Sequence, residues 1–409
     1  MKLLNVDTVE QVREKLASHF GNQGRKAEFA GIGEAVGRYA ADDIAADADM
    51  PGFRRSVVDG YAVRAKETYG VSDSIPVFLR IAGSVEMGKI HCDTLRSGEA
   101  VYVPTGGMIP EGADAVVMIE YIDCLDEGTI AIYKPAAPGS GIMNVGDDYR
   151  QGDILFRKGH RMSVKDIGML AACGLSRIPV YAKPVLSIIS TGDEIVEIGA
   201  SPLPGQIRDI NGHAVRAFAE AAGAAVSEIR IFHDDFDVCR SYVADEIKKS
   251  DLVLISGGSS AGNKDMTADI IDSLGEPGVF THGIAIKPGK PTIIGDAGGK
   301  PVFGLPGHPM SAIIVFKAVV EPFIKNRFFG NDEEALGVPA WITENIHAGE
   351  GRETYQLVTL EKTGKGWQAE PIRAKSGAIS QLMKADGYIR IGALTEGVSA
   401  GMEVEVTLL

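Results

Sequence analysis

The sequence contains few cysteines and no long apolar run. Four cysteines are spread over 409 residues, and no two of them form a C-x-x-C pair, which argues against a zinc knuckle. Scattered cysteines fit a reducing compartment, and the start MKLLNVDTVEQ becomes polar too early for a signal peptide. The apolar stretch at 312–316 is far shorter than the roughly 18 residues that a membrane helix needs. We therefore expect a cytoplasmic protein with no membrane partner.

The sequence also lacks a surplus of positive charge. Its formal net charge is −14, and it has no basic stripe of the kind that binds duplex nucleic acid. We expect no nucleic-acid partner. An anionic substrate must then be bound by a few placed cations rather than by a general positive field.

Several well-known catalytic motifs are missing. The eight histidines form neither H-x-H nor H-E-x-x-H, and no G-x-S-x-G or Walker A sequence is present. The sequence therefore identifies no activated nucleophile. Its candidate chemistry rests on glycine-rich loops, lysines and carboxylates.

The clearest structural pattern is a series of short apolar runs that alternate with helical patterns after about residue 180. The runs lie at 184–190, 228–232, 251–256 and 301–305. The helical patterns lie at 211–222, 238–247, 266–274 and 311–324. Continuous apolar strands alternating with helices are typical of a parallel sheet covered on both faces. We expect a three-layer α/β/α domain with a parallel-rich sheet.

The rest of the chain is expected to be mainly β. Residues 76–134 contain short apolar runs separated by Gly and Pro turns, which favours a β-rich N-terminal lobe. The tail from 341 alternates apolar and polar residues and suggests a small barrel or sandwich. One helix is expected after Thr8, where Gln11 completes a capping box, and another opens at Ser163.

Four loops of the α/β domain carry the candidate chemistry, because ligands of open parallel sheets bind beyond the carboxyl ends of the strands. These loops span 190–194, 256–265, 285–290 and 305–311. The glycine-rich loop 256–265 leads into a helix, so its backbone N–H groups and the helix N-terminus favour a phosphate. The alternative is a turn that only reverses the chain.

Lysines and carboxylates complete this candidate site. Lys287 and Lys290 bracket a stiff Pro-Gly turn, and a close ion pair with a dianion there contributes about 4 kcal/mol at an effective dielectric of 20. Glu194 follows one strand, and Asp234 and Asp265 lie near other strand ends, which together suggests a metal–phosphate site. A solvated turn for the lysines and helix N-caps for single aspartates are the alternatives.

Seven short motifs occur in an order and spacing that a known family shares. They are SVVDGYAVR (56–64), PTGGMIPEGADAVV (104–117), GDD (146–148), STGDE (190–194), SGGSSAGNKD (256–265), AIKPGKP (285–291) and LPGHP (305–309). As a set they resemble the molybdopterin molybdenumtransferases, or molybdenum insertases, the family of bacterial MoeA and the animal gephyrin E-domain. The resemblance covers nearly the whole chain.

This resemblance implies a fold, a reaction and an assembly. The implied parts are an elongated N-terminal module (1–50 and 138–180), a β-rich lobe (51–137), a three-layer molybdopterin-binding domain (181–327) and a C-terminal β-barrel (335–409). The implied reaction inserts molybdenum from molybdate into adenylylated molybdopterin, with Mg²⁺ as cofactor and release of AMP, in molybdenum cofactor biosynthesis. The implied assembly is a homodimer with a shared active site. Further implied partners are molybdopterin adenylyltransferase and apo-molybdoenzymes.

The resemblance also implies the site residues. The implied catalytic residues are Asp59, Asp148, Asp234, Asp265, Lys287 and Lys290. The implied substrate-binding residues are Thr105, Gly192, Glu194, Gly257, Gly258, Ser259, Gly262, Pro306, Gly307, Arg352 and Ser376. The expected metal ligands are Asp59, Asp234 and Glu194.

Three positions depart from the commonest form of the family. Val58 precedes Asp59 where the family often has Met, Gly107 stands where it often has Ala, and His308 stands where it often has Asn. The acidic and basic positions are kept, so activity is expected. The choice between molybdate and tungstate, which are near-identical dianions, stays open.

Two other functions are alternatives to this one. The α/β domain alone also resembles the adenylyltransferases that activate molybdopterin with ATP, but those proteins usually lack the other three parts. A non-catalytic molybdopterin-binding scaffold is the second alternative. The presence of Asp59, Asp234 and Lys287, and the lack of a long linker or fused partner domain, argue against it.

Overall fold

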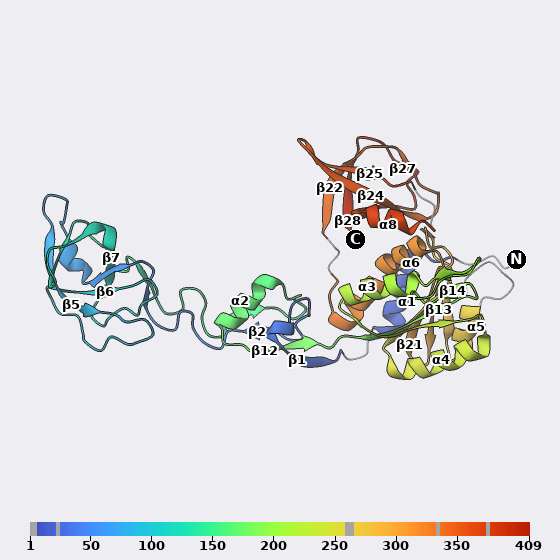
Figure 1. Ribbon diagram of the computed structural model, residues 1–409, viewed down its shortest axis with the longest axis horizontal. Helices are drawn as coiled ribbons and strands as arrows, with labels where there is room; N and C mark the ends of the chain where they lie inside the picture. The colour runs from blue at the N-terminus through green and yellow to red at the C-terminus, as the bar shows by residue number, and fades with distance from the viewer. Residues whose placement is uncertain (1–5, 22–24, 258–265, 333–335, 374–376) are drawn as a thin grey trace.

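The chain forms an elongated molecule with a β lobe at one end and an α/β block at the other (Figure 1). This computed structural model describes residues 6–21, 25–257, 266–332, 336–373 and 377–409. A narrow connecting region joins the lobe to the block, and a C-terminal barrel lies on the block. The expected multidomain architecture of α/β and β parts is confirmed.

A six-stranded sheet forms the centre of the α/β block, in the order β16-β13-β17-β21-β20-β18. Its strands are β13 (Val185–Thr191), β16 (Ala225–Phe232), β17 (Leu252–Ser256), β18 (Gly278–His282), β20 (Ile293–Ala297) and β21 (Lys300–Leu305). The first four strands in this order run parallel, whereas β20 and β18 each pair antiparallel with their neighbour. The four predicted apolar runs are the parallel strands, which confirms the parallel-rich sheet. The prediction missed β18 and β20.

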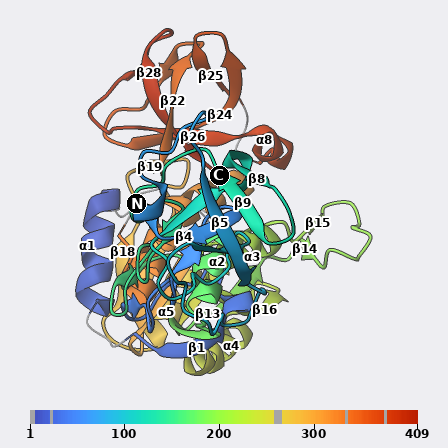
Figure 2. The ribbon, with the colours of Figure 1, turned by 90° about the vertical axis from the view of Figure 1, so that its left-hand side faces the viewer.

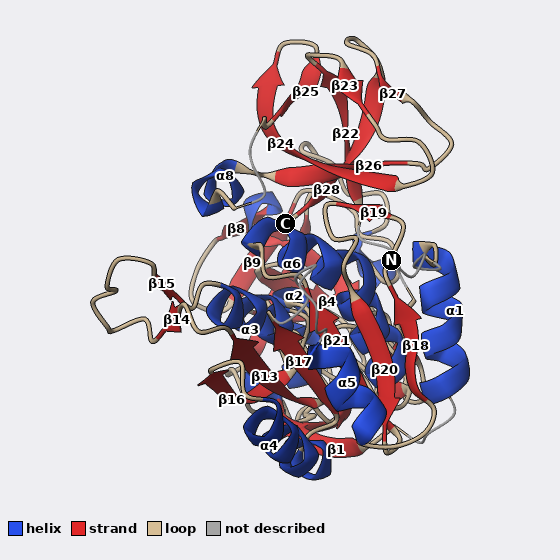
Figure 3. Cartoon of the chain, turned by 90° about the vertical axis from the view of Figure 1, so that its right-hand side faces the viewer, coloured by secondary structure: helices blue, strands red, loops and turns tan. Residues whose placement is uncertain are grey.

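Helices cover both faces of this sheet (Figure 3). Helices α3 (Asn211–Ala221) and α6 (Pro309–Val315) pack on one face, and α4 (Phe236–Lys249) and α5 (Met266–Ser273) pack on the other. Successive strand side chains point to opposite faces, so Leu254 joins the core under the first pair and Ile255 joins the core under the second. The expected three layers are therefore confirmed.

Helix α6 continues as a helical rod through α7 (Glu321–Ile324) to Phe329, where Gly330 ends it in the left-handed conformation at φ 67°. Helix α1 (Val9–Phe20) packs beside this rod and begins with the predicted capping box. Thr8 Oγ1 accepts from the Gln11 N–H at 3.2 Å, and Gln11 Oε1 accepts from the Thr8 N–H at 2.9 Å. No helix in the described ranges is long and apolar enough to span a membrane.

A second six-stranded sheet forms the N-terminal lobe, in the order β7-β4-β6-β5-β9-β8. Its strands are β4 (Gly60–Val63), β5 (Val77–Ser84), β6 (Glu99–Val103), β7 (Ala115–Met118), β8 (Ile122–Cys124) and β9 (Thr129–Ile132). Strands β5 and β6 pair in parallel, and the other neighbours pair antiparallel. Buried side chains fill a core on each face of the sheet, with Tyr61 in one and Ala62 in the other. The expected β-rich lobe is confirmed.

Short strand pairs and one helix form the connecting region. The pairs are β1 (Ala27–Gly31) with β12 (Arg177–Tyr181), β2 (Ile44–Ala45) with β11 (Ile154–Phe156), and β3 (Arg55–Ser56) with β10 (Ile142–Met143). Helix α2 (Val164–Ala172) is the predicted helix after Ser163. Tyr39 stacks on Phe329 with ring centroids 4.4 Å apart, and Arg25 Nε donates to the Arg327 carbonyl at 3.2 Å. These contacts anchor the connecting region on the α/β block.

Five strands close into the C-terminal barrel. They are β22 (Gly337–Ile342), β24 (Glu353–Thr363), β25 (Gly366–Pro371), β26 (Gly387–Ile391) and β28 (Glu403–Leu408). Strand β24 pairs with both β25 and β26, which closes the ring and confirms the expected barrel. Beside it, β23 (Ile346–His347) pairs with β27 (Gly397–Val398), and α8 (Ile379–Lys384) contacts α6.

Two short pairings extend the α/β block. Strands β14 (Ile195–Val196) and β15 (Ile207–Arg208) pair at the base of an arm that projects from the block (Figure 2). Strand β19 (Ile286–Lys287) pairs with β24 and so ties the block to the barrel.

The division of the chain into four parts stays a proposal. It counts residues 1–50 with the elongated module, whereas the structure packs α1 into the core of the α/β block through Val9, Val12, Leu16 and Phe20. The later residues of that range lie in the connecting region.

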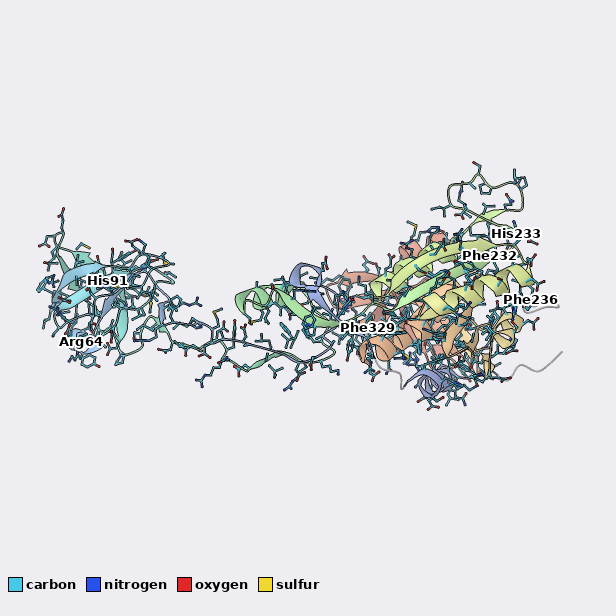
Figure 4. The ribbon with its side chains drawn as sticks, turned by 90° about the horizontal axis from the view of Figure 1, so that it is seen from below. Arg64, His91, Phe232, His233, Phe236 and Phe329 are labelled. Carbon is cyan, nitrogen blue, oxygen red and sulfur yellow. The ribbon has the colours of Figure 1, made fainter. Side chains whose placement is uncertain are left out.

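Phe329 gives a test of how firmly the connecting region is attached. Its ring is 2% exposed and stacks on Tyr39, so Phe329→Ala should cost about 3–5 kcal/mol and lower the melting temperature by several degrees. Calorimetry of the purified variant checks this. Phe236→Ala is the matched control, because that ring is 38% exposed and its loss should change the melting temperature little (Figure 4). Equal losses in both variants would contradict the stacking account.

Candidate functional site

The carboxyl ends of the parallel strands meet at one edge of the sheet. Ser190, Ser256 and Leu305 are register partners across β13, β17 and β21, and Thr191 pairs with Phe232 of β16. Predicted site residues that follow these ends therefore leave the sheet at the same edge. They are Gly192, Glu194, Asp234, Gly257, Pro306 and Gly307.

The turn that carries Lys287 and Lys290, here called the lysine turn, also lies at this edge. It leads into the antiparallel strand β20. Ile293 at the start of β20 pairs with Gly304 near the end of β21, so the turn just before Ile293 lies on the same side of the sheet. Lys287 and Lys290 are both exposed, whereas the residues around them are largely buried. Two ammonium groups are thus presented to solvent from a fixed turn, where an oxyanion can meet them.

Two glycines permit close approaches at this edge. Gly257 has φ 108°, and a Cβ there would lie 2.1 Å from the Thr191 carbonyl oxygen. Gly289 lies between the two lysines with φ 123°, and a Cβ there would lie 2.5 Å from Val315 Cγ2. Both positions require glycine, so the turns can follow the sheet edge closely.

The barrel brings Arg352 next to the lysine turn. In the β19–β24 pairing Ile286 is the register partner of Glu353, whose N–H donates to the Ala285 carbonyl at 2.9 Å. Glu353 is 8% exposed and accepts two hydrogen bonds from Arg390, at 2.9 Å from Nε and 3.0 Å from the terminal nitrogen. This charged fork is the strong, directional kind and fixes the start of β24. Arg352, the exposed residue before Glu353, is thereby held beside the lysine turn.

Acidic side chains gather on the other flank of the edge. Asp193 Oδ1 accepts from the Asp234 N–H at 3.2 Å and lies 3.4 Å from Nδ1 of His233. Glu194 folds back over the chain, so that a Cβ at Gly192 would lie 2.7 Å from its Oε2. The pKa of Asp234 is raised above its usual value of 3.8 by burial, and then by the neighbouring charges of Asp193 and Glu194. A cation placed here would relieve that repulsion.

The first turn of α3 holds three strand ends together, and sequence reasoning missed it. Asp209 accepts from Ser190 Oγ and from the Gly212 N–H, each at 2.9 Å. Asn211 Nδ2 donates to Ser256 Oγ and to the Gly307 carbonyl, each at 2.8 Å. The signal available in the sequence was a polar pair, with Asp209 just before the predicted helix 211–222 and Asn211 as its first residue, between two site loops.

Two predicted site residues meet in the N-terminal lobe. The antiparallel pairing of Gly60 with Val103 brings Asp59 to Thr105, whose N–H donates to Asp59 Oδ1 at 2.9 Å. Asp148 lies elsewhere, in the connecting region, where its N–H donates to the Met50 carbonyl at 3.0 Å.

Within one chain the lobe lies far from the sheet edge. The β lobe and the α/β block occupy opposite ends of the molecule (Figure 1). In Figure 4, Arg64 lies in the lobe while His233 lies toward the opposite end of the molecule. The structure therefore brings the predicted residues together as two separate groups, with Asp148 between them in the chain.

Five predicted residues lie outside the described part of the chain. They are Gly258, Ser259, Gly262, Asp265 and Ser376.

The expected metal ligands Asp59, Asp234 and Glu194 do not come together within one chain. Over the described ranges, no group of three or more His, Cys, Asp or Glu side chains is arranged to hold a metal ion. Carboxylate oxygens are nevertheless the ligands that Mg²⁺ prefers. Glu194 and Asp234 on the block fit an incomplete oxygen set that requires further ligands from substrate, water or another chain.

A well-formed cavity lies away from this edge. It has a volume of about 520 Å³ and lies between α1, the helical rod and the barrel, with Arg13, Lys317, Glu321 and Tyr388 among its lining residues. None of the predicted site residues lines it. Cavity volume alone therefore does not identify the candidate site, which rests on the convergence of strand ends and charges.

Comparison with known protein families covers nearly the whole chain. Residues 7–174 match the family described as MoeA N-terminal region (domain I and II). Residues 187–326 match the family described as probable molybdopterin binding domain, and residues 340–409 match the MoeA C-terminal region (domain IV).

Individual relatives agree with these matches. A putative molybdopterin biosynthesis protein of Methanocaldococcus jannaschii is 31% identical over 100% of this chain and 98% of its own length. The molybdopterin molybdenumtransferase of Bacillus subtilis is 31% identical over 96% of this chain and 91% of its own length. A solved MoeA protein structure from Pyrococcus horikoshii superposes with a TM-score of 0.83 at 39% identity, over 99% of both chains.

The raised pKa of Asp234 predicts a pH-dependent stability difference. Because the folded chain holds this proton more tightly than the unfolded chain, the wild type loses stability as pH rises through the raised pKa. Asp234→Asn removes that loss, so its melting temperature should exceed that of the wild type at pH 7. The gain should vanish below the unfolded value of 3.8, and calorimetry across pH checks this.

Glu194→Gln provides the matched background for this measurement. It removes one of the charges that raise the Asp234 pKa, so Asp234→Asn should bring a smaller gain there. A gain of the same size at pH 3 and pH 7 would contradict the electrostatic cause.

Proposed function

The chain belongs to the MoeA family of molybdopterin molybdenumtransferases, and from this premise we propose that it inserts molybdenum from molybdate into adenylylated molybdopterin with release of AMP. This is a transferase step of molybdenum cofactor biosynthesis. The observation that carries the proposal is that Lys287 and Lys290 are both exposed from one turn at the sheet edge, with the chain at Arg352 running beside the strand that leads into this turn. On a chain with a net charge of −14, these placed cations are what an anionic substrate needs.

The cations and backbone donors bind the oxyanions. Lys287 and Lys290 approach molybdate or phosphate oxygens from one turn, and each close pair contributes on the order of 4 kcal/mol at an effective dielectric of 20. Arg352 adds a planar donor that suits oxyanions. Gly307, which is exposed and has open space beside its Cα, offers unhindered backbone next to the adenylyl phosphate. These contacts hold both anions so that they react as neighbours.

The carboxylates act on the divalent ion and on water. Asp234 and Glu194 supply oxygen ligands from the block, and Asp59 supplies a further one from a lobe. Mg²⁺, when bound, neutralises charge on the pyrophosphate. Asp234 also orients the attacking water and takes its proton as the phosphorus–oxygen bond breaks and AMP leaves.

The proposed active site is shared between two subunits. Asp59 and Thr105 form one hydrogen-bonded unit in the lobe, and the lobe lies at the opposite end of the molecule from the sheet edge. A homodimer in which the lobe of one subunit meets the α/β block of the other would join the two groups. We also propose that the protein is cytoplasmic and that it is divided into the four parts given above. Its expected partners are molybdopterin adenylyltransferase and recipient apo-molybdoenzymes.

The direct test supplies the purified protein with adenylylated molybdopterin, molybdate and Mg²⁺, and follows reconstitution of a cofactor-free molybdoenzyme. Molybdate-dependent reconstitution supports the proposal. ATP-dependent adenylylation of molybdopterin by this chain would replace the proposal with the adenylyltransferase reaction, and binding without turnover would indicate a scaffold.

Lys287→Ala should lower kcat/KM in this assay by about 100-fold, because an oxyanion contact in a partly desolvated site is lost. The control is Lys248→Ala, which removes an exposed lysine paired with Asp245 on α4 and should leave kcat/KM within about twofold. Equal activities of the two variants would contradict the role of the lysine turn.

Subunit complementation tests the shared site. Asp59→Asn and Lys287→Ala should each be nearly inactive alone. An equal mixture that has been dissociated and reassociated should recover about a quarter of wild-type activity, since half of the dimers are mixed and each mixed dimer has one intact site. Mixed dimers that form without recovering activity would show that both residues act within one chain.

A further inference from the structure

One amide side chain bridges two of the site loops. Asn211, the first residue of α3, is 8% exposed. Its Nδ2 lies 2.8 Å from Ser256 Oγ, at the end of β17, and 2.8 Å from the carbonyl oxygen of Gly307, in the loop after β21. The side chain therefore spans the two strands whose loops carry the glycine-rich and Pro-Gly turns.

The chemistry of the partners fixes which end of the amide faces the loops. The Gly307 carbonyl can only accept a hydrogen bond, so the group that faces it must be the NH₂. Both N–H bonds of Nδ2 are then used, one for each loop. Asn211 Oδ1 is buried and makes no hydrogen bond over the described ranges.

The nearby Asp209 attaches the start of α3, which carries Asn211, to the sheet. Asp209 is 3% exposed and accepts from Ser190 Oγ at the end of β13 and from the Gly212 N–H in α3. The start of α3 is thus attached to β13 before Asn211 extends to β17 and β21. The three strand ends are joined through one helical turn.

The geometry points to Asn211 as a positioning residue that sets the gap between the Ser256–Gly257 turn and the Pro306–Gly307 loop, where the adenylyl phosphate of the substrate binds. This inference deepens the proposed function and rests on it for the identity of the ligand. No other small side chain does the same work. Aspartate would turn an acceptor toward the Gly307 carbonyl, serine can donate to only one of the two acceptors, and alanine can donate to neither.

AMP binding tests the positioning role with a neutral substitution. Asn211→Ala should raise the dissociation constant of AMP, measured by titration calorimetry, by about tenfold, because the two loops are no longer held at the bound spacing. Asn211→Ser, which keeps one donor, should fall between the alanine variant and the wild type.

Val215→Ala is the matched stability control. Val215 lies on the buried face of the same helix and is 1% exposed, so its truncation destabilises α3 without removing a hydrogen bond to either loop. It should lower the melting temperature but leave the AMP dissociation constant within about twofold of the wild type. An equal rise in both variants would reduce Asn211 to a structural residue and overturn the inference.

Hydrogen exchange makes the test independent of the proposed ligand. In Asn211→Ala, peptides that cover 305–312 should exchange about tenfold faster than in the wild type, while Val215→Ala leaves them unchanged. If the wild type binds no AMP and shows no turnover, the proposed function fails, and faster exchange still supports Asn211 as the bridge between the loops. Unchanged exchange in Asn211→Ala would overturn the positioning role whatever the ligand.

Discussion

The in-register parallel pairing of β16, β13, β17 and β21 is the constraint on which the rest of the structure depends. Parallel strands that end at the same level must send their next residues out at one edge. Acidic, glycine-rich and Pro-Gly segments that are far apart in the sequence therefore become neighbours. The antiparallel strand β20 begins where β21 ends, which adds the lysine turn to the same edge. The helices cover the faces of this sheet, and its register decides which side chains can cooperate.

Two polar attachments then hold the edge in shape. On one side, the first turn of α3 links three strand ends through Asp209 and Asn211. On the other side, the Glu353–Arg390 fork steadies the start of β24, whose pairing with β19 joins the barrel to the block. The acceptors Asp209, Ser256 and Glu353 are buried, where hydrogen bonds are hardest to replace with water. The flexible charged side chains at the sheet edge are thus attached to a rigid backbone.

The pattern of apolar residues was sufficient to predict the central fold from the sequence. Runs such as 251–256 are apolar throughout because both faces of the sheet are covered, and that identified the parallel strands and the three layers. The strand β18 was missed because Gly278 and polar residues interrupt its apolar pattern, and β19 is too short to produce a pattern at all.

The candidate site could be predicted from the sequence only in part. Loop composition and the family resemblance indicated the lysines and carboxylates, and strand order supports their meeting at one edge. The contact of Asp59 with Thr105 depends on the β4–β6 pairing, which no local pattern encodes. Asp209 and Asn211 were missed because helical periodicity predicts where α3 begins, but it does not predict which groups the side chains at that end bond to. The distance between the lobe and the block depends on the course of the whole chain, so no local sequence pattern could predict it either.

A crystal structure of the protein with AMP would test the central claim most directly. The account predicts the AMP phosphate in the gap between the Ser256–Gly257 turn and the Pro306–Gly307 loop, with Asp59 of the partner subunit completing the site. AMP in the cavity between α1 and the barrel, or a sheet edge that no lobe of another subunit approaches, would contradict it.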